Sequence, residues 1–263
     1  MEISFQGKTA LVTGGLGNLG LHICNYLLKS KISKLVILDK KIDKKIASNI
    51  KSQSGQELIF LEADLCNIVN LKDSISDKLQ TLPHLDIMIN NAAFVGTSDL
   101  DGWSVDYFMQ SLHAWEKAHF LNLTAVNELI KIAYPYMNNS HNNLTSIINV
   151  ASIYGSTAPD WSLYQGTGMD NPLAYNTSKA GLIQLTKYLA RYFSGKNIRV
   201  NSVSPGGIEN SQDNKFITKY SERVPLKRMA NFEEISKIIV LLSHSDFEYI
   251  NGQNIIVDGG FTI

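Results

Sequence analysis

The sequence predicts an α/β fold, with a doubly wound, mostly parallel seven-stranded sheet and helices on both of its faces. Short apolar runs alternate with helical segments along the chain, which is typical of parallel strands joined by helices. Glycines, small residues and ligand-binding side chains follow the ends of several runs. The chain has 263 residues, 44% of them hydrophobic, which is enough for one large core. No linker, repeat or low-complexity stretch divides it, so we expect a single domain over residues 1–263.

Composition narrows the classes of function. The 24 basic and 24 acidic residues give zero formal net charge, so neither a nucleic acid nor an anionic membrane is expected as a partner. The two cysteines form no Cys-x-x-Cys motif and the six histidines show no ligand spacing, so no metal site is expected. The N-terminus lacks the apolar core of a signal peptide, and no apolar run approaches the ~20 residues of a membrane span. We expect a cytoplasmic protein.

The first strand, turn and helix form a candidate phosphate-binding unit. The apolar run Thr9–Val12 ends at a glycine-rich turn, and apolar residues then recur with helical spacing from Leu19 to Leu28. Glycines in such a turn let the backbone approach a pyrophosphate at the helix N-terminus. A lone glycine-rich turn is usually only a turn, but here a strand precedes it and a helix follows. The candidate contacts with a dinucleotide in this turn are Gly14, Gly17, Asn18 and Leu19.

Asp39 stands where a ribose partner is expected. It ends the second apolar run, Leu35–Leu38, nineteen residues after Gly20. A carboxylate there can accept both hydroxyls of an adenosine ribose and would repel a 2′-phosphate. The alternative is a solvated aspartate at a strand end. We expect NAD as the cofactor; the neighbouring Lys40 and Lys41 leave NADP open.

The remaining runs continue the alternation in chain order. Helical segments are expected at about 42–52, 69–79, 114–137, 182–193 and 232–242, and strands at 58–61, 86–89, 146–150, 198–203 and 253–257. Ligands of such sheets bind at the carboxyl ends of the strands. The further candidate cofactor contacts at those ends are Asp64, Leu65, Asn91, Ala92, Pro205, Gly206 and Ile208. Three polar or irregular stretches are expected as substrate-side loops, namely 94–113, 153–174 and 207–231, the last as a candidate mobile lid.

Tyr175 and Lys179 are candidate catalytic residues. Residues four apart share one face of a helix, so the phenol and the ammonium group can face the same point. A nearby cation favours the phenolate and lowers its pKa from about 10, which would suit proton exchange with a carbonyl/alcohol pair. The same spacing recurs at Tyr192 and Lys196, so the pattern alone is weak. Ser152, at the end of a strand, is the natural partner for the substrate oxygen.

Taken in order, these motifs resemble the short-chain dehydrogenase/reductase family from end to end. The resemblance covers the glycine turn, Asp39, Asn90-Asn-Ala-Ala, Tyr175-x-x-x-Lys179 and the closing Val257-Asp-Gly-Gly. It implies a single-domain Rossmann fold and a catalytic tetrad of Asn122, Ser152, Tyr175 and Lys179. In that tetrad Tyr175 is the acid/base, Ser152 holds the substrate oxygen, Lys179 binds the nicotinamide ribose and Asn122 supports a proton relay.

Three departures from the family pattern bear on the substrate. Asn18 replaces the usual middle glycine, a spacing shared with the branch that modifies sugar nucleotides. The interval from Ser152 to Tyr175 is long, and Asn210 or Ser211 stands in for a missing threonine. The long interval is similar to that of flagellin-modification oxidoreductases, which implies a sugar-like or nucleotide-linked substrate.

Two other functions remain open. One is an epimerase or dehydratase that retains NAD, and the other is an inactive dinucleotide-binding protein. Apolar residues at Ile235, Ile238, Ile239 and Leu242 exceed the apparent need of one sheet face, so a homodimer or homotetramer is also expected.

Overall fold

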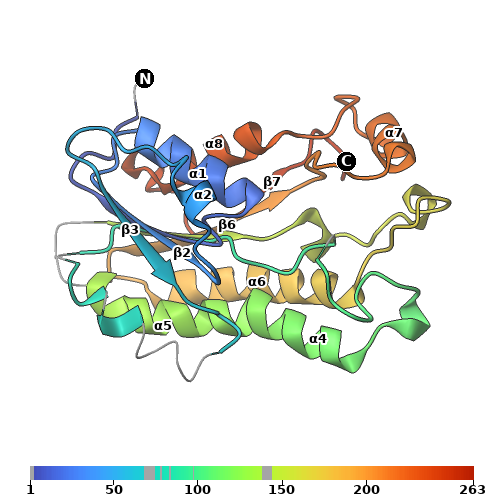
Figure 1. Ribbon diagram of the computed structural model, residues 1–263, viewed down its shortest axis with the longest axis horizontal. Helices are drawn as coiled ribbons and strands as arrows, with labels where there is room; N and C mark the ends of the chain where they lie inside the picture. The colour runs from blue at the N-terminus through green and yellow to red at the C-terminus, as the bar shows by residue number, and fades with distance from the viewer. Residues whose placement is uncertain (1–2, 68–74, 78, 83, 97, 138–143) are drawn as a thin grey trace.

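Seven parallel strands form one sheet in the order β3-β2-β1-β4-β5-β6-β7. The computed structural model describes residues 3–67, 75–77, 79–82, 84–96, 98–137 and 144–263 (Figure 1). The strands are β1 (Thr9–Thr13), β2 (Lys34–Asp39), β3 (Glu57–Glu62), β4 (Ile87–Asn90), β5 (Thr145–Val150), β6 (Ile198–Pro205) and β7 (Asn254–Val257). The strand order runs outward from β1 in one direction and then resumes at β4 in the other. The predicted doubly wound sheet is therefore confirmed.

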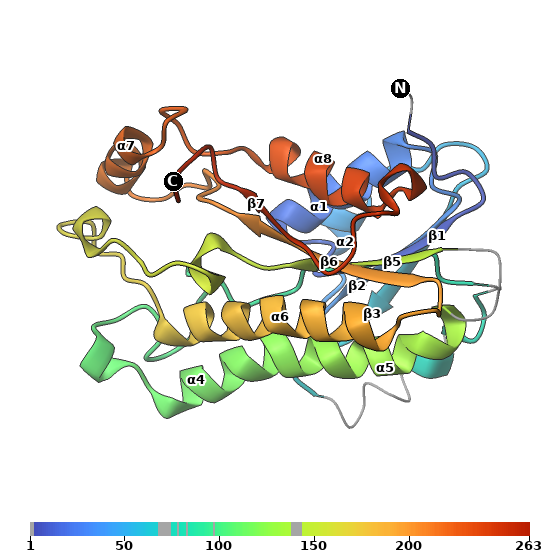
Figure 2. The ribbon, with the colours of Figure 1, turned by 180° about the vertical axis from the view of Figure 1, so that it is seen from behind.

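Helices cover both faces of the sheet, as Figures 1 and 2 show. The helices α1 (Asn18–Lys29) and α8 (Phe232–Ser243) lie on one face, and α4 (Leu112–His119), α5 (Ala125–Met137) and α6 (Leu173–Tyr192) lie on the other. Side chains alternate across β1: Leu11 joins the core under α5 and α6, whereas Ala10 and Val12 join the core under α1 and α8. Both faces of the strand are thus buried, which explains its uninterrupted apolar sequence.

Two predicted helices differ from the structure. The segment 42–52 is helical only in α2 (Lys44–Ala47), where the Asp43 side chain caps the first turn and no helical residue is buried. Without an apolar stripe, nothing in the fold extends this helix. The predicted helix 114–137 is divided into α4 and α5 by a π-helical turn, Phe120–Thr124, which contains Asn122. The predicted helix 69–79 lies largely outside the described residues.

The sequence suggested an irregular loop over 207–231. The structure differs, because this segment contains the helix α7 (Asn214–Arg223). The Asp213 side chain caps this helix by accepting hydrogen bonds from Lys215 N and Phe216 N. Phe216 and Tyr220, one helical turn apart, are both buried. Their spacing was the signal for a helix that the polar composition concealed.

The apolar residues of α8 belong to the core. Ile235 and Ile239 are fully buried and Leu242 is 5% exposed, in the cluster shared with α1. The prediction of an oligomer drew on these residues, and that part of its reasoning was wrong because they have partners within the subunit.

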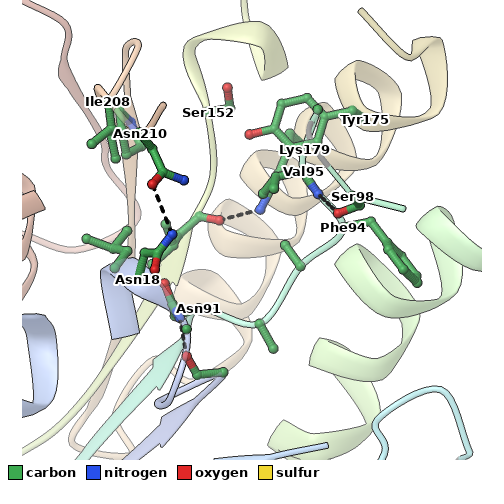
Figure 3. A pocket seen from close by; sticks show the side chains of 18 of the residues that line it. Asn18, Asn91, Phe94, Val95, Ser98, Ser152, Tyr175, Lys179, Ile208 and Asn210 are labelled. Atoms are coloured by element: carbon green, nitrogen blue, oxygen red, sulfur yellow. Dashed lines mark hydrogen bonds between the residues drawn. The ribbon is translucent and has the colours of Figure 1, made fainter. Parts of the chain in front are cut away.

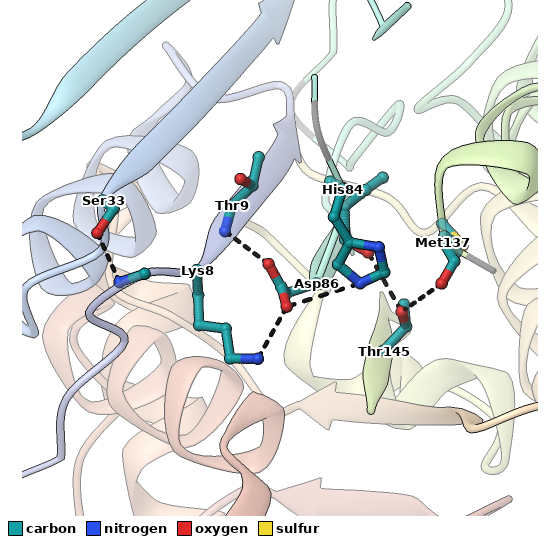
Figure 4. A network of polar contacts seen from close by, with 9 residues as sticks. Lys8, Thr9, Ser33, His84, Asp86, Met137 and Thr145 are labelled. Atoms are coloured by element: carbon teal, nitrogen blue, oxygen red, sulfur yellow. Dashed lines mark hydrogen bonds and ion pairs between the residues drawn. The ribbon is translucent and has the colours of Figure 1, made fainter. Parts of the chain in front are cut away.

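A polar network ties together the beginnings of three strands at the edge opposite the glycine turn (Figure 4). The Asp86 carboxylate accepts hydrogen bonds from Thr9 N and from the Lys8 ammonium group, both at 2.9 Å, and His84 Nε2 lies 3.7 Å from it. Thr145 Oγ1 donates to Leu85 O and Met137 O. Buried charge is acceptable here because the carboxylate is paired and hydrogen-bonded. Among the described residues, no helix is long and apolar enough to cross a membrane.

Candidate active site

A cavity of about 770 Å³ opens at the carboxyl ends of the strands. Residues that follow six of the seven strands line it, from Gly14 after β1 to Gly206 after β6. The structure places every residue predicted to contact the cofactor on this lining: Gly14, Gly17, Asn18, Leu19, Asp39, Asp64, Leu65, Asn91, Ala92, Tyr175, Lys179, Pro205, Gly206 and Ile208. Ser152 lines the same cavity, whereas Asn122 does not.

The glycine turn is packed too closely for larger residues. Gly14 has a φ of +61°, and a Cβ there would lie 2.9 Å from Ala92 Cα. The Asn91 side chain donates hydrogen bonds to Thr13 O and Gly14 O, at 3.1 and 3.0 Å. Thr13 Oγ1 in turn accepts from the backbone N–H groups of Asn91 and Ala92. Sequence reasoning missed Thr13, whose only signal was its position directly before the turn.

The turn and its surroundings fit an adenine dinucleotide. The N-cap of α1 is Gly17, which provides no capping side chain, so the first-turn N–H groups remain available to a pyrophosphate. Asp39 Oδ2 accepts a hydrogen bond from Leu16 N at 3.0 Å, which fixes the carboxylate against the turn at the wall of the cavity. Asp64 Oδ1 accepts from Cys66 N at 2.9 Å and so orders the next strand end.

Ser152, Tyr175 and Lys179 converge on the other half of the cavity (Figure 3). Lys179 is 3% exposed, and its Nζ donates a hydrogen bond of 2.7 Å to Val150 O. This burial lowers the pKa of Lys179 to about 7. The same Nζ lies 5.8 Å from the centroid of the Tyr175 ring. The helical spacing of these residues thus brings phenol and amine to one place, because α6 continues unbroken through both.

The pKa of Tyr175 moves in the direction opposite to the prediction. Burial raises it, a hydrogen bond with Ser152 lowers it, and the nearby Tyr164 raises it again, with burial the largest effect. The predicted lowering by Lys179 is not seen because that amine is directed at Val150 O and is itself disfavoured as a cation by burial. The phenol in this structure is therefore a protonated group at neutral pH.

Asn122 lies beneath the cavity wall and is fully buried. Its Oδ1 accepts a hydrogen bond from Phe94 N at 2.8 Å, and its Nδ2 donates to Phe94 O at 3.2 Å and to Ser178 Oγ at 3.1 Å. The side chain thus fastens the segment after β4 to α6, the helix that carries Tyr175. The structure brings Asn122 to the support of the site and does not bring its side chain to the cavity.

The segment between Ser152 and Tyr175 forms a wall that sequence reasoning described only in outline. Tyr154 and Tyr164 share a hydrogen bond of 2.9 Å between their hydroxyl groups, and Asn171 Nδ2 donates to the Tyr164 hydroxyl at 2.9 Å. Tyr164 also packs against Phe216 of α7. The helix α7 is held to this segment because Lys219 Nζ donates to two of its carbonyl groups.

One side chain joins the two halves of the cavity. Asn18 Nδ2 donates a hydrogen bond of 3.1 Å to Asn210 Oδ1, which links the glycine turn to the segment after β6 (Figure 3). Of the two stand-ins for the missing threonine, Asn210 lines the cavity, and Ser211 is not among the lining residues.

A parallel sheet of this order, with a dinucleotide-binding turn and a Ser-Tyr-Lys set at one edge, defines a class of dinucleotide-dependent oxidoreductases. A family model described as enoyl-(acyl carrier protein) reductase matches residues 19–262. The chain therefore belongs to the short-chain dehydrogenase/reductase family and is an oxidoreductase.

Individual relatives are similar to the chain over its whole length. Post-translational flagellin modification protein A of Campylobacter coli is 28% identical, over 97% of this chain and 98% of the relative. The 3-oxoacyl-[acyl-carrier-protein] reductase FabG of Thermotoga maritima is 29% identical, over 98% and 99%. These two relatives have different names and nearly equal identity, so the similarity does not select a substrate.

Solved structures agree with the fold. A short-chain dehydrogenase from Leptospira borgpetersenii with bound NAD⁺ superposes with a TM-score of 0.82 at 30% identity, over 99% of this chain and 94% of that one. An RhlG/NADP complex from Pseudomonas aeruginosa gives 0.84 at 26% identity, over 100% and 99%.

Proposed function

We propose that the protein uses NAD(H) to interconvert a secondary alcohol and a ketone on a sugar-like, polyhydroxylated or nucleotide-linked substrate. The observation that carries this proposal is that the candidate cofactor-binding residues and the candidate catalytic residues line one cavity. The Ser152, Tyr175 and Lys179 side chains open into the same space as the glycine turn and Asp39. A role in carbohydrate biosynthesis, a cytoplasmic location and a homodimeric or homotetrameric assembly belong to the same proposal.

The chain's own residues supply binding and proton transfer. Bound NAD(H) supplies or accepts the hydride. Ser152 and Tyr175 both open into this part of the cavity, and Ser152 is near enough to lower the pKa of the phenol, so a substrate oxygen placed between them can be held by both hydroxyl groups. Tyr175, protonated because burial raises its pKa, gives its phenolic proton to the substrate oxygen when a ketone is reduced. Lys179, fixed at Val150 O, provides a nitrogen beside the phenol that titrates near neutral pH.

The wall of the cavity supports a polar substrate. Tyr154, Asp170, Asn171 and Gln212 line it with hydroxyl, carboxylate and amide groups, which are the partners of sugar hydroxyls. Similarity to a protein named for flagellin modification, together with the long interval between Ser152 and Tyr175, favours a sugar-like substrate over a simple ketone.

One observation favours a second candidate, an epimerase or dehydratase that keeps its cofactor. The Asn18–Asn210 hydrogen bond spans the cavity between the glycine turn and the opposite segment. A link of this kind would slow the exchange of a bound dinucleotide. This second candidate predicts NAD that survives purification and no net formation of NADH, and Asn210→Ala would then lose bound NAD during purification.

The test of the proposed chemistry compares two tyrosines. Tyr175→Phe should remove most turnover and leave NADH binding, followed by fluorescence, largely intact. The matched control is Tyr192→Phe, because Tyr192 is also followed by a lysine four residues later, is 59% exposed and lies outside the cavity lining. Near-normal turnover by Tyr175→Phe, in a screen of sugars and nucleotide sugars, would contradict the assignment of the proton donor. Loss of NADH binding in both variants would point to damage to the fold.

A further inference from the structure

The substrate half of the cavity is acidic. We give this name to the part lined by residues of the three substrate-side segments, Ser98, Asp99, Tyr154, Met169, Asp170, Asn210 and Gln212. Two of these residues are carboxylates, and none is a lysine or arginine. The charge of this half bears on which substrate the proposed oxidoreductase accepts, and the inference rests on that proposed function.

Asp170 lines the cavity and is connected through Asn171 to Tyr164. Its carboxylate accepts a hydrogen bond from Asn171 N at 2.7 Å, and Asn171 in turn binds the Tyr164 hydroxyl. Burial raises the pKa of Tyr164, the hydrogen bonds with Tyr154 and Asn171 lower it, and the negative charge of Asp170 raises it by a smaller amount. Burial is the largest cause of the raised pKa of Tyr175, and the nearby Tyr164 also raises it. The Asp99 carboxylate has no hydrogen-bond or ion-pair partner among the residues that the structure describes.

The cations near this half are engaged elsewhere. Lys219 donates to Ser162 O and Gln165 O, and Arg223 is paired with Asp160. Neither is part of the cavity lining. Lys179 is committed to Val150 O.

Two other lysines, Lys40 and Lys117, do line the cavity. Burial raises the pKa of the Cys66 thiol, and the positive charges of both lysines oppose that rise. Cys66 follows Asp64 closely, so both lysines belong to the end of the cavity assigned to adenosine. Within the described residues, the substrate half therefore has no basic side chain free to neutralise an anion.

The helix N-termini do not replace the missing cations. The first N–H groups of α7 are taken by the Asp213 carboxylate, at 2.8 Å from Lys215 N and 3.4 Å from Phe216 N. Asp170 lies just before α6 and places a negative charge at that N-terminus. The N-cap residues of α1 and α6 provide no capping side chain. The N-terminus of α1 belongs to the cofactor half, and at α6 the Leu173 N–H is taken by Gln110 Oε1 at 2.9 Å. A phosphate is usually bound by arginines, lysines or open helix N-termini. Among the described residues, the substrate half offers no free arginine or lysine, and the N-terminus of α6 is already occupied by Gln110 and faces the negative charge of Asp170.

We propose that the reacting part of the substrate carries hydroxyl or ammonium groups and no phosphate or carboxylate. A free sugar or amino sugar meets this description, whereas a sugar phosphate or a nucleotide-linked sugar does not. Asp170 and Asp99 accept hydrogen bonds from its hydroxyl or ammonium groups and repel an anion. Met169, Phe216 and Met229 supply an apolar surface for the carbon face of the ring.

The test uses substrates that differ in charge. Glucosamine, N-acetylglucosamine, glucosamine 6-phosphate and UDP-N-acetylglucosamine are compared as substrates with NAD⁺, and kcat/KM is measured for each. Ethyl acetoacetate and acetoacetate, a neutral and an anionic ketone, are compared with NADH. We expect the uncharged or cationic member of each comparison to be favoured by about tenfold or more. Asp170→Asn should reduce that preference several-fold. Asp246→Asn, the same change at an exposed aspartate outside the cavity lining, should leave it unaltered.

The outcomes separate this inference from the function on which it rests. Preference of the wild type for glucosamine 6-phosphate over glucosamine would overturn the charge selection while a sugar oxidoreductase remained. An effect of Asp170→Asn no larger than that of Asp246→Asn would do the same. If no sugar reacts and the two ketones do, the proposed sugar substrate fails. A preference for ethyl acetoacetate over acetoacetate would then support the charge selection, and equal kcat/KM values for the two ketones would overturn it.

Discussion

The side chain of Asn122 holds both backbone polar groups of Phe94, accepting from its N–H at 2.8 Å and donating to its C=O at 3.2 Å. The amide thereby forms the same pair of hydrogen bonds that a neighbouring β-strand would form with Phe94, and it connects a helix to a loop. The π-helical turn around Asn122 places its side chain in this position, and π-helical turns are frequent at functional sites. Phe94 also belongs to the small apolar cluster around Trp103 that packs on Tyr175.

Asn122→Ala is expected to weaken both the fold and the site. It leaves the N–H and C=O of Phe94 without their partner in a partly buried place, which costs about 1–3 kcal/mol of unfolding free energy. Urea unfolding measures the loss. Asn127→Ala, five residues further along the same helical stretch, serves as the control because, among the described residues, its side chain binds the neighbouring Glu128 and not Phe94. Equal stability of the two variants would show that the Phe94 contacts are dispensable.

Asp39 is expected to select NAD(H) over NADP(H). Its carboxylate should bind the adenosine ribose and repel a 2′-phosphate, a difference of about ten- to a hundredfold in affinity. Titration of NADH and NADPH by fluorescence quenching, with wild type and Asp39→Ala, measures the ratio. Asp43→Ala is the control, since Asp43 caps α2 and does not line the cavity. Equal binding of both cofactors by the wild type, or an unchanged ratio in Asp39→Ala, would exclude Asp39 as the selector.

Lys179→Met is expected to stabilise the fold at low pH while removing activity. Burial lowers the pKa of Lys179 from 10.5 to about 7, so the charged form is disfavoured in the folded state. Between these pH values the unfolded chain binds more protons, so this group makes the wild type more stable as the pH rises. The cost of burying the cation is thus complete below pH 7 and disappears towards pH 10.5.

The variant should therefore gain about 1–3 kcal/mol at pH 6, with a smaller gain at pH 9, after the loss of the hydrogen bond to Val150 O is included. Thermal or urea unfolding at the two pH values checks this. Lys187→Met, at an exposed position of the same helix, should show no such dependence. A gain that is equal at both pH values would contradict the lowered pKa.

A dimer or tetramer remains a prediction, now with a different surface. In the 3-10 turn before α4 and at the first residue of α4, Phe108, Met109 and Leu112 are 87%, 71% and 70% exposed, which is unusual for large apolar side chains in a monomer. Light scattering at micromolar concentration should give a multiple of 29.2 kDa. The change Phe108→Ser should lower that mass if this surface takes part. A wild type that stays at 29.2 kDa would refute the prediction.

Local patterns were sufficient for the sheet and for most of the cavity. Strands buried on both faces read as continuous apolar runs, and a parallel sheet brings their ends to one edge. Gly14, Asp39, Ser152 and Lys179 could therefore be assigned to one site before their contacts were known. The helix α7 was missed because its short apolar face, Phe216 and Tyr220, lies in an otherwise polar segment.

By itself, the sequence determined where most strands lie along the chain and which residues follow their carboxyl ends. It could do so because hydrophobic periodicity and turn residues are local features of the chain. The tertiary structure decided what depends on distant partners. It buried Lys179 against Val150 O and raised the pKa of Tyr175, since removal of water outweighs a neighbouring amine that is itself desolvated. It also turned Asn122 from the cavity towards Phe94 and gathered Asp170 with Tyr164 around the substrate half. Burial and charge depend on all the elements that meet at a point, and no single stretch of sequence contains them.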